Sequence, residues 1–134
     1  MHRLRIGMRS SHSYSADPER LADHYGNAGV PVLATPHLVR LLETECLACV
    51  AGALDDGCAT VGTRIDIRHL AATPSGMRFE LTAELTEIDR RRLVFTVNAR
   101  DEVELIMSGT HERFVVETAV FLANAAAKRS SRTV

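Results

Sequence analysis

The sequence predicts an α+β domain in which a five-stranded antiparallel sheet packs against one long helix. Residues 35–54 combine a helix-start signal with a broad apolar stripe, and the segments around them alternate between apolar and polar side chains. The turns between the later segments are short, which favours antiparallel neighbours. Because one helix cannot cover five strands, we expect a second copy of the chain to complete the structure.

The first expected element is a half-buried strand over about residues 4–14, where apolar and charged side chains alternate. The pair Asp17-Pro18 then combines a helix cap with a proline at the first helical position. This signal predicts a short helix through about Tyr25. Residues 26–34 contain two glycines and a proline, so we expect a loop there.

The long helix is expected to begin at Thr35-Pro36, which repeats the cap-plus-proline signal, and to end near Leu54. It contains few charged residues, so we expect it to be largely buried. Its main apolar stripe advances in steps of three and four residues and consists of Leu38, Leu42, Cys46, Cys49 and Ala53.

Four further strands are expected, over about residues 61–68, 77–86, 93–99 and 104–117. After them we expect a short helical start and then a frayed tail from about residue 129. The chain shows no internal repeat and no interdomain linker, so residues 1–134 are treated as a single domain.

The composition argues against several classes of partner. Lys and Arg total 16 against 17 Asp and Glu, and only 4% of residues are aromatic, which is a poor supply for nucleic-acid binding. No apolar run approaches the roughly 20 residues that span a bilayer, and the N-terminus shows no signal-peptide pattern. Three cysteines in no disulfide pattern favour a reducing, cytoplasmic location.

Three side chains are candidates for chemistry at a carbonyl group. Thr35 reads first as a helix cap, but the same helix end offers free N–H groups and a partial positive charge to an oxyanion. Glu43 lies two turns further on, roughly 12 Å along the axis, among apolar neighbours that favour a partly buried general base. An imidazole or a residue of a partner subunit would have to bridge this gap. His69 stands at a strand end beside a turn, where functional residues gather.

Other candidates have simpler structural interpretations. His111 lies within a strand, where a structural role is expected. Cys46 and Cys49 form a C-x-x-C pattern in mid-helix, and with Cys58 as the only other cysteine a zinc site lacks a fourth ligand, so we expect core cysteines and no metal. The Arg90-Arg91-Arg92 run is first a charged turn, and second a candidate for holding the phosphates of a ligand.

Several passages, in order, resemble the hotdog-fold acyl-CoA thioesterases, and among these the fluoroacetyl-CoA thioesterase branch. The resemblance covers about residues 5–128, and the spacing of Thr35, Glu43 and His69 is its most persuasive part. Its most specific strings are Ala71-Ala72-Thr73-Pro74-Ser75-Gly76 and Gly109-Thr110-His111-Glu112-Arg113. The other matching passages are Ala34-Thr35, Leu42-Glu43 through Cys46, Val61-Gly62-Thr63, Ala83-Glu84-Leu85 and Arg91-Arg92-Leu93.

The resemblance implies a hotdog fold, in which the sheet wraps around one long central helix, and a homodimer formed through the sheet with active sites at the subunit interface. It implies catalytic roles for Thr35, Glu43 and His69. The backbone of Gly62 would contact the acyl thioester, and we assign Arg113, from the second specific string, to substrate binding as well. The resemblance implies no metal and no organic cofactor.

We therefore expect hydrolysis of an acyl thioester of coenzyme A or of an acyl-carrier-protein, with Glu43 and His69 activating either Thr35 or a water molecule. In the fluoroacetyl-specific enzyme, phenylalanines before the catalytic threonine form a hydrophobic lid. Residues 26–34 contain no aromatic residue, so a different short or medium acyl group is expected here. The alternative is a non-catalytic dimeric module that binds acyl-CoA or another apolar ligand. A hotdog hydratase or dehydratase would need a His/Asp arrangement that we do not find.

Overall fold

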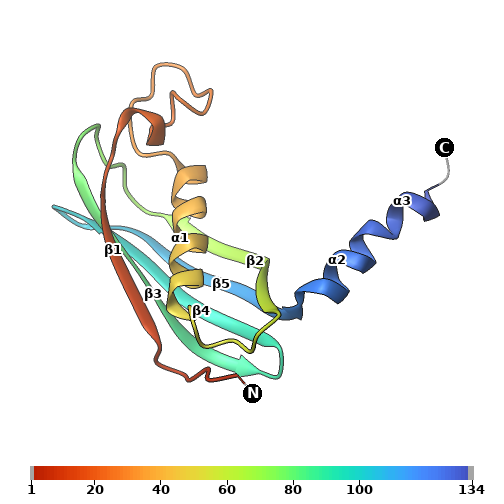
Figure 1. The fold of residues 1–134 in the computed structure, drawn as a ribbon. Helices are drawn as coiled ribbons and strands as arrows, with labels where there is room; N and C mark the ends of the chain where they lie inside the picture. Colours follow the sequence, from red (N-terminus) through yellow and green to blue (C-terminus); the bar gives the residue numbers. More distant parts are fainter. Residues whose placement is uncertain (1, 133–134) are drawn as a thin grey trace.

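The computed structural model describes residues 2–132 and contains a five-stranded sheet with helices (Figure 1). The strands are β1 (Arg9–Ser15), β2 (Cys58–His69), β3 (Arg78–Asp89), β4 (Arg92–Asp101) and β5 (Leu105–Glu117). The helices are the 3₁₀ turn η1 (Pro18–Arg20), α1 (Thr35–Cys49), α2 (Thr118–Ala126) and α3 (Lys128–Ser131). The prediction of a five-stranded antiparallel sheet is confirmed: the strand order is β1-β3-β4-β5-β2 and every pairing is antiparallel.

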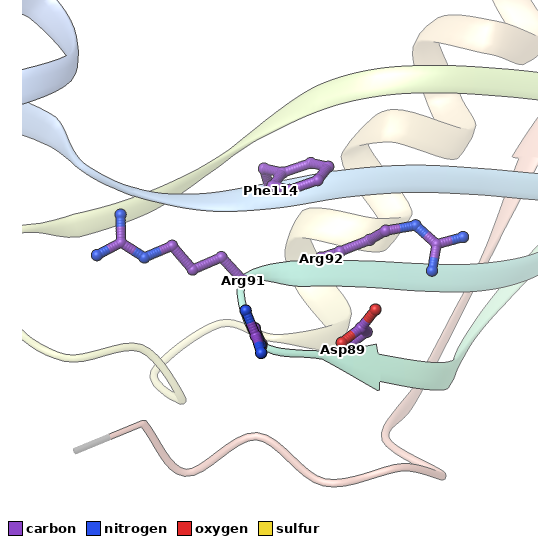
Figure 2. Close-up of a pocket in the computed structure, with 5 residues that line it drawn as sticks. Asp89, Arg91, Arg92 and Phe114 are labelled. Carbon is purple, nitrogen blue, oxygen red and sulfur yellow. The ribbon is translucent and has the colours of Figure 1, made fainter.

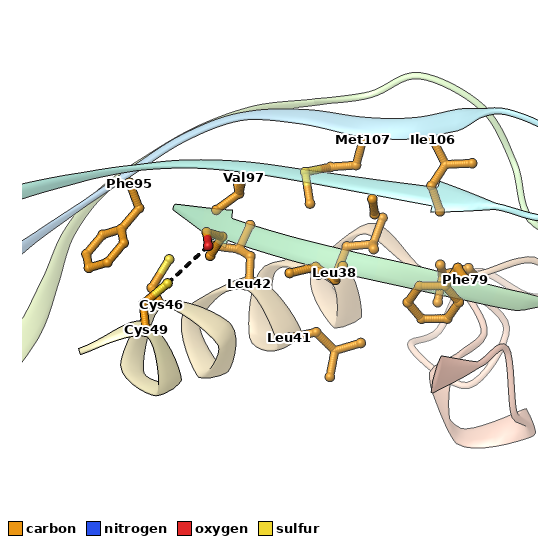
Figure 3. Packing of buried hydrophobic residues seen from close by; sticks show 14 of the residues in the cluster. Leu38, Leu41, Leu42, Cys46, Cys49, Phe79, Phe95, Val97, Ile106 and Met107 are labelled. Carbon is orange, nitrogen blue, oxygen red and sulfur yellow. Dashed lines mark hydrogen bonds between the residues drawn. The ribbon is translucent and has the colours of Figure 1, made fainter. Parts of the chain in front are cut away.

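The core lies between α1 and the sheet (Figure 3). Leu38, Leu42 and Cys46 on the helix are fully buried, and across from them lie strand residues such as Phe95 and Val97. Burying such side chains contributes about 1.5–3 kcal/mol each. The apolar stripe read from the sequence therefore holds α1 on the sheet.

The cysteines behave as core residues, as the sequence predicts. Cys46 and Cys49 are buried and Cys58 is partly buried, and all three are free thiols. The Cys49 thiol donates to the Ala83 carbonyl at 3.1 Å, the contact drawn in Figure 3. Burial raises the pKa of Cys49 to about 11 and raises that of Cys46 further, so both stay protonated and unreactive at neutral pH.

The N-terminal elements are shorter than predicted. The first strand begins at Arg9 rather than near Leu4, because Gly7 adopts a φ of +99° and turns the chain before it joins β3. The helix expected through Tyr25 is wrong: only the 3₁₀ turn Pro18–Arg20 forms. Leu21 is extended and pairs with Leu33, and residues 22–26 form turns with their own backbone hydrogen bonds in place of a helix.

Helix α1 also differs from its prediction. It ends at Cys49 rather than near Leu54, and Gly52 with a φ of +75° follows in the turn. The expectation of a largely buried helix is only partly met, because the sheet covers one side and leaves Leu47 46% exposed.

The C-terminal segment is more helical than predicted. Where a frayed tail is expected from about residue 129, α3 continues to Ser131, while residues 133–134 lie outside the described part of the chain. In Figure 1, α2 and α3 project from the end of β5, away from the sheet. Over the described residues, every helix falls short of the length and apolar character that crossing a membrane requires.

Candidate active site

The predicted site residues fall into two groups, each beside its own surface hollow. Thr35 and His69 line a hollow of about 360 Å³ together with residues 70–72. Glu43 and Gly62 line another of about 230 Å³ that also includes His111. Within one chain, Thr35 and Glu43 stay two helical turns apart.

Thr35 is not the helix cap that the sequence predicts. Ala34 is the N-cap: its φ of −78° and ψ of 137° are extended, and its carbonyl accepts the N–H groups of His37 and Leu38 at 3.1 Å. Thr35 is thus the first helical residue, and its hydroxyl makes no capping hydrogen bond. The hydroxyl is instead 2.7 Å from Nδ1 of His69.

The start of α1 offers one free backbone donor beside this hydroxyl. Pro36 has no N–H, and the next two N–H groups are used by the Ala34 carbonyl. The N–H of Thr35 makes no hydrogen bond within residues 2–132. A carbonyl placed there would meet this N–H and the positive end of the helix dipole.

The His69 imidazole lies within hydrogen-bond distance of the Thr35 hydroxyl. It ends strand β2, and its Nε2 is buried with no hydrogen-bond partner in the described part of the chain. Burial lowers the pKa of His69, against a smaller raising effect of the Ala71 backbone. The ring is therefore mostly neutral at pH 7, and in the tautomer in which the Thr35 hydroxyl donates to Nδ1 the ring proton lies on Nε2.

The turn after β2 fixes the approach to this pair. Thr73 is fully buried, donates its hydroxyl to Asp101 at 2.9 Å, and accepts the N–H of Leu33 through its carbonyl at 2.9 Å. The specific string at residues 71–76 thus ties the end of β2 to the segment that leads into Thr35.

Glu43, on α1, lies beside polar residues of β2 and β5. Its side chain is 41% exposed, less buried than expected, and Arg113 lies 3.4 Å from its Oε2. The nearly buried Arg113 guanidinium also donates to Thr60 at 2.8 Å and to His111 Nε2 at 3.0 Å. Opposite them, Gly62 leaves just enough room, since a Cβ there would come 3.2 Å from Glu43 Oε2 and 3.3 Å from Arg113.

His111 has the structural role expected of it. It is 1% exposed, and its Nδ1 donates to the Arg64 carbonyl at 2.8 Å while Nε2 accepts from Arg113. Burial is the main cause that lowers the pKa of His111, so it remains neutral. Both ring nitrogens are used, and the ring braces Arg113 beside Glu43.

Two polar groups near α1 escaped the sequence analysis. Glu45 is fully buried and bonds to Ser10 and to His12, whose Nδ1 is 2.7 Å away. On the loop before α1, the Tyr25 hydroxyl contacts Nδ1 of the buried His37 at 2.6 Å. The available signals were a carboxylate directly before Cys46 in the apolar stripe, and a tyrosine at the edge of an otherwise non-aromatic loop.

Comparison with known proteins gives one consistent answer. The model of the family described as fluoroacetyl-CoA-specific thioesterase matches residues 16–119. A fluoroacetyl-CoA thioesterase from Streptantibioticus cattleyicolor is 39% identical over 124 residues, covering 88% of this chain and 89% of that protein.

Solved structures agree with these sequence matches. A point mutant of a fluoroacetyl-CoA-specific thioesterase, in complex with fluoroacetate and CoA, superposes with a TM-score of 0.81 at 39% identity and covers 88% of this chain and 99% of that one. A hot-dog-like protein from Thermanaerovibrio acidaminovorans has a TM-score of 0.87 at 18% identity, covers 93% of both chains, and supports the fold alone.

Proposed function

We propose that this chain, which belongs to the fluoroacetyl-CoA-specific thioesterase family, hydrolyses an acyl-CoA in a site completed by a second copy of the chain. Family membership makes it a thioester hydrolase rather than a passive binding module. The relative that binds fluoroacetate and CoA supports CoA over an acyl-carrier-protein as the thiol carrier. The loop over residues 26–34 has no aromatic side chain, which favours a short or medium acyl group other than fluoroacetyl.

The contact between Thr35 and His69 is the observation that carries this proposal. A neutral imidazole that accepts the threonine proton at Nδ1 must present an N–H at Nε2. A buried N–H without a partner is costly, so a further acceptor is expected beside it. We place Glu43 of a second copy as that acceptor. Because Nε2 is shielded within one chain, the imidazole ring must turn toward the subunit interface, and the hydroxyl, imidazole and carboxylate then form a hydrogen-bonded triad.

Strand β2 explains how two copies bring these groups together. It lies at the edge of the sheet, is twelve residues long and has half of its residues exposed, and an unpaired edge of that length can pair with another strand. Two such strands can pair antiparallel about a twofold axis. A twofold axis through Ile65 or Asp66, near the middle of the segment from Gly62 to His69, sets Gly62 of one copy within one residue of the position opposite His69 of the other.

The chemistry follows from these positions. The thioester carbonyl lies at the start of α1, and the Thr35 N–H and the helix dipole stabilise the oxyanion, with the Gly62 backbone on the other side. Thr35 or a water molecule attacks the carbonyl carbon, the imidazole takes the proton, and the C–S bond breaks as the thiolate receives that proton. Where Thr35 attacks, a water molecule then cleaves the acyl-threonine ester with the imidazole as base, which releases the acid and returns a proton to Thr35. Arg113 orients Glu43 through its contacts with His111 and Thr60 rather than touching the substrate.

The proposed working state is a homodimer in the cytoplasm. Three free cysteines, two of them buried, suit a reducing compartment. The partly exposed Leu47 on the open side of α1 is a further surface that a second copy could cover.

A panel of acyl-CoA thioesters of graded chain length, read out by free thiol, tests the proposed function. We expect turnover with short or medium chains, and a decrease in kcat of about 10²–10⁴ in Glu43→Gln and in His69→Ala, as for lost acid–base catalysis. Glu80→Gln, an exposed carboxylate on β3, is the matched control. Near-normal kcat in both site variants would overturn the assigned roles, and accumulation of an acyl-enzyme on rapid mixing would select attack by Thr35 over attack by water.

A further inference from the structure

We propose that the hairpin between β3 and β4, together with Phe114, binds the nucleotide end of coenzyme A: Arg90 and Arg91 hold its phosphates and the Phe114 ring stacks on its adenine. This inference rests on the proposed acyl-CoA substrate and adds the place where that substrate is recognised. A cavity of about 570 Å³ is lined by Asp89, Arg90, Arg91, Arg92 and Phe114 (Figure 2). It is larger than either hollow beside the proposed catalytic residues.

The charges of this hairpin are divided unevenly. Arg92 is neutralised along the sheet by Glu87 and Glu112. Arg90 and Arg91, both exposed, make no ion pair within residues 2–132, and only Asp89 stands beside them in the cavity. In Figure 2 the Arg91 side chain points away from that of Arg92. Two guanidinium groups are therefore free for phosphate oxygens, which arginine binds through paired hydrogen bonds.

The conformation of Arg90 is unusual for a residue that only closes a turn. Its φ of +57° makes it the one non-glycine residue of the described chain in the left-handed region, a position that suits glycine. An arginine held there at a cost in backbone energy fits a binding role for the side chain.

Aromatic rings gather at the same place. Of the four phenylalanines, Phe79 and Phe95 are buried in the core, whereas Phe114 lines the arginine cavity. Phe121 lines the adjoining hollow of about 320 Å³, which Arg91 shares. A partly exposed ring beside cations is the arrangement that accepts a nucleobase by stacking.

The register of the sheet places this cavity near the proposed catalytic carboxylate along β5, but on the other face of the sheet. Phe114 pairs with Arg92 on one side and Val61 on the other, and the preceding residue, Arg113, points to the opposite face and contacts Glu43. A hollow of about 410 Å³ is lined by Leu47, residues 50–52 and residues 54–60; it begins one helical turn after Glu43 and includes Cys58. Cys58 pairs with Glu117, which lines the hollow that Arg91 shares, and we place the pantetheine arm along these neighbouring hollows.

Kinetics with two thioesters of the same acyl group test this proposal: the acyl-CoA, and the acyl-pantetheine that lacks the nucleotide. In Arg91→Gln and Arg90→Gly we expect KM for the acyl-CoA to rise about five- to tenfold, as when a charge-assisted hydrogen bond is lost at a surface, with kcat and the acyl-pantetheine kinetics unchanged. Arg90→Gly should fold at least as stably as the parent, because glycine suits a φ of +57°. Phe114→Leu should show the same substrate-dependent increase in KM, and Arg9→Gln, on the opposite edge strand, should show none.

Equal changes for both thioesters, or no change for either, would overturn the nucleotide site while leaving the thioesterase function intact. If the parent protein hydrolyses neither thioester, the proposed function fails, and calorimetric titration with 3′,5′-adenosine bisphosphate then decides the site alone. Binding that weakens in Arg91→Gln but not in Arg9→Gln supports it, and identical or undetectable binding by parent and variants contradicts it.

Discussion

The hydroxyl oxygen of Thr35 lies 2.7 Å from Nδ1 of His69, although the two residues are 34 positions apart and belong to different elements. The contact exists because Ala34 takes the capping position and leaves the threonine side chain unused by the helix. It also leaves the second imidazole nitrogen buried and without a hydrogen-bond partner in the described part of the chain.

The pH dependence of kcat/KM should report the buried imidazole. Burial lowers the pKa of His69, so the neutral, proton-accepting form persists as the pH falls below the ordinary histidine value of about 6.5. We expect the acid limb of the profile below that value. Ala72→Asp places a carboxylate in the hollow beside His69 and should raise this pKa and move the limb to higher pH. Ala72→Asn should leave the limb in place, and a limb equally unmoved in both variants would assign it to another group.

Folding stability should fall in mild acid. Burial is the main cause of the lowered pKa values of His37, His69 and His111 in the folded chain. The unfolded chain therefore binds more protons just below pH 6.5, and the free energy of unfolding decreases as the pH falls from there through the folded-state pKa values. Urea unfolding at pH 7.5 and 5.5 measures the loss, which should be smaller in His37→Gln. A stability that is constant or rises toward pH 5.5 would contradict the prediction.

Replacing a glycine by alanine should affect activity at Gly62, on β2, and stability at Gly109, on the neighbouring strand β5. In Gly62→Ala the new Cβ presses on the Glu43 and Arg113 side chains at 3.2–3.3 Å, so we expect a folded protein with kcat/KM reduced roughly tenfold by a misplaced carboxylate. In Gly109→Ala the Cβ would lie 2.2 Å from the Asp66 carbonyl, which only backbone movement can relieve, and stability should fall by roughly 1–3 kcal/mol or more. Activity and urea unfolding of both variants check this, and unchanged kinetics in Gly62→Ala would remove Glu43 from the site.

The buried Glu45 is expected to act in folding and not in catalysis. Glu45→Ala leaves the Ser10 hydroxyl and the His12 imidazole without their carboxylate partner, so we expect a loss of roughly 1–3 kcal/mol in the free energy of unfolding. Thr44→Ala, its exposed neighbour, should change stability by only a few tenths of a kcal/mol. At a temperature where the variant is folded, kcat should match the parent, and a large decrease in kcat with stability intact would show that the cluster takes part in the reaction.

The sheet and the start of α1 were predictable because alternation and a Thr-Pro start are local signals. The strands after the helix, such as β3, were found because one face of each is buried and the other is not. The ends of elements were less predictable. Gly7, just before β1, and Gly52, just after α1, adopt positive φ angles that cannot be read from the sequence. The helix predicted before Tyr25 does not form, because Leu21 pairs with Leu33, twelve residues further along the chain.

The contact between Thr35 and His69 agrees with the candidates chosen from the sequence, whereas the placement of Glu43 was only partly predictable. Sequence reasoning grouped Thr35, Glu43 and His69, but it took Thr35 for the cap and left open what bridges the gap to Glu43. The contacts that decide these points, from Ala34 to the helix and from Arg113 to Glu43, join segments far apart in the chain. The burial of Glu45 was not predicted, because a carboxylate beside an apolar stripe is expected to face solvent unless its partners on β1 are known.

The most direct test of the shared site mixes two inactive proteins. Glu43→Gln and Thr35→Ala homodimers are combined, subunit exchange is verified by native mass spectrometry, and thiol release from an acyl-CoA is measured. Random exchange makes half of the dimers mixed, each with one intact site, so the account predicts recovery of about a quarter of the parent activity. Mixed dimers that form fully and stay as inactive as either variant would contradict a site that takes Thr35 and His69 from one subunit and Glu43 from the other.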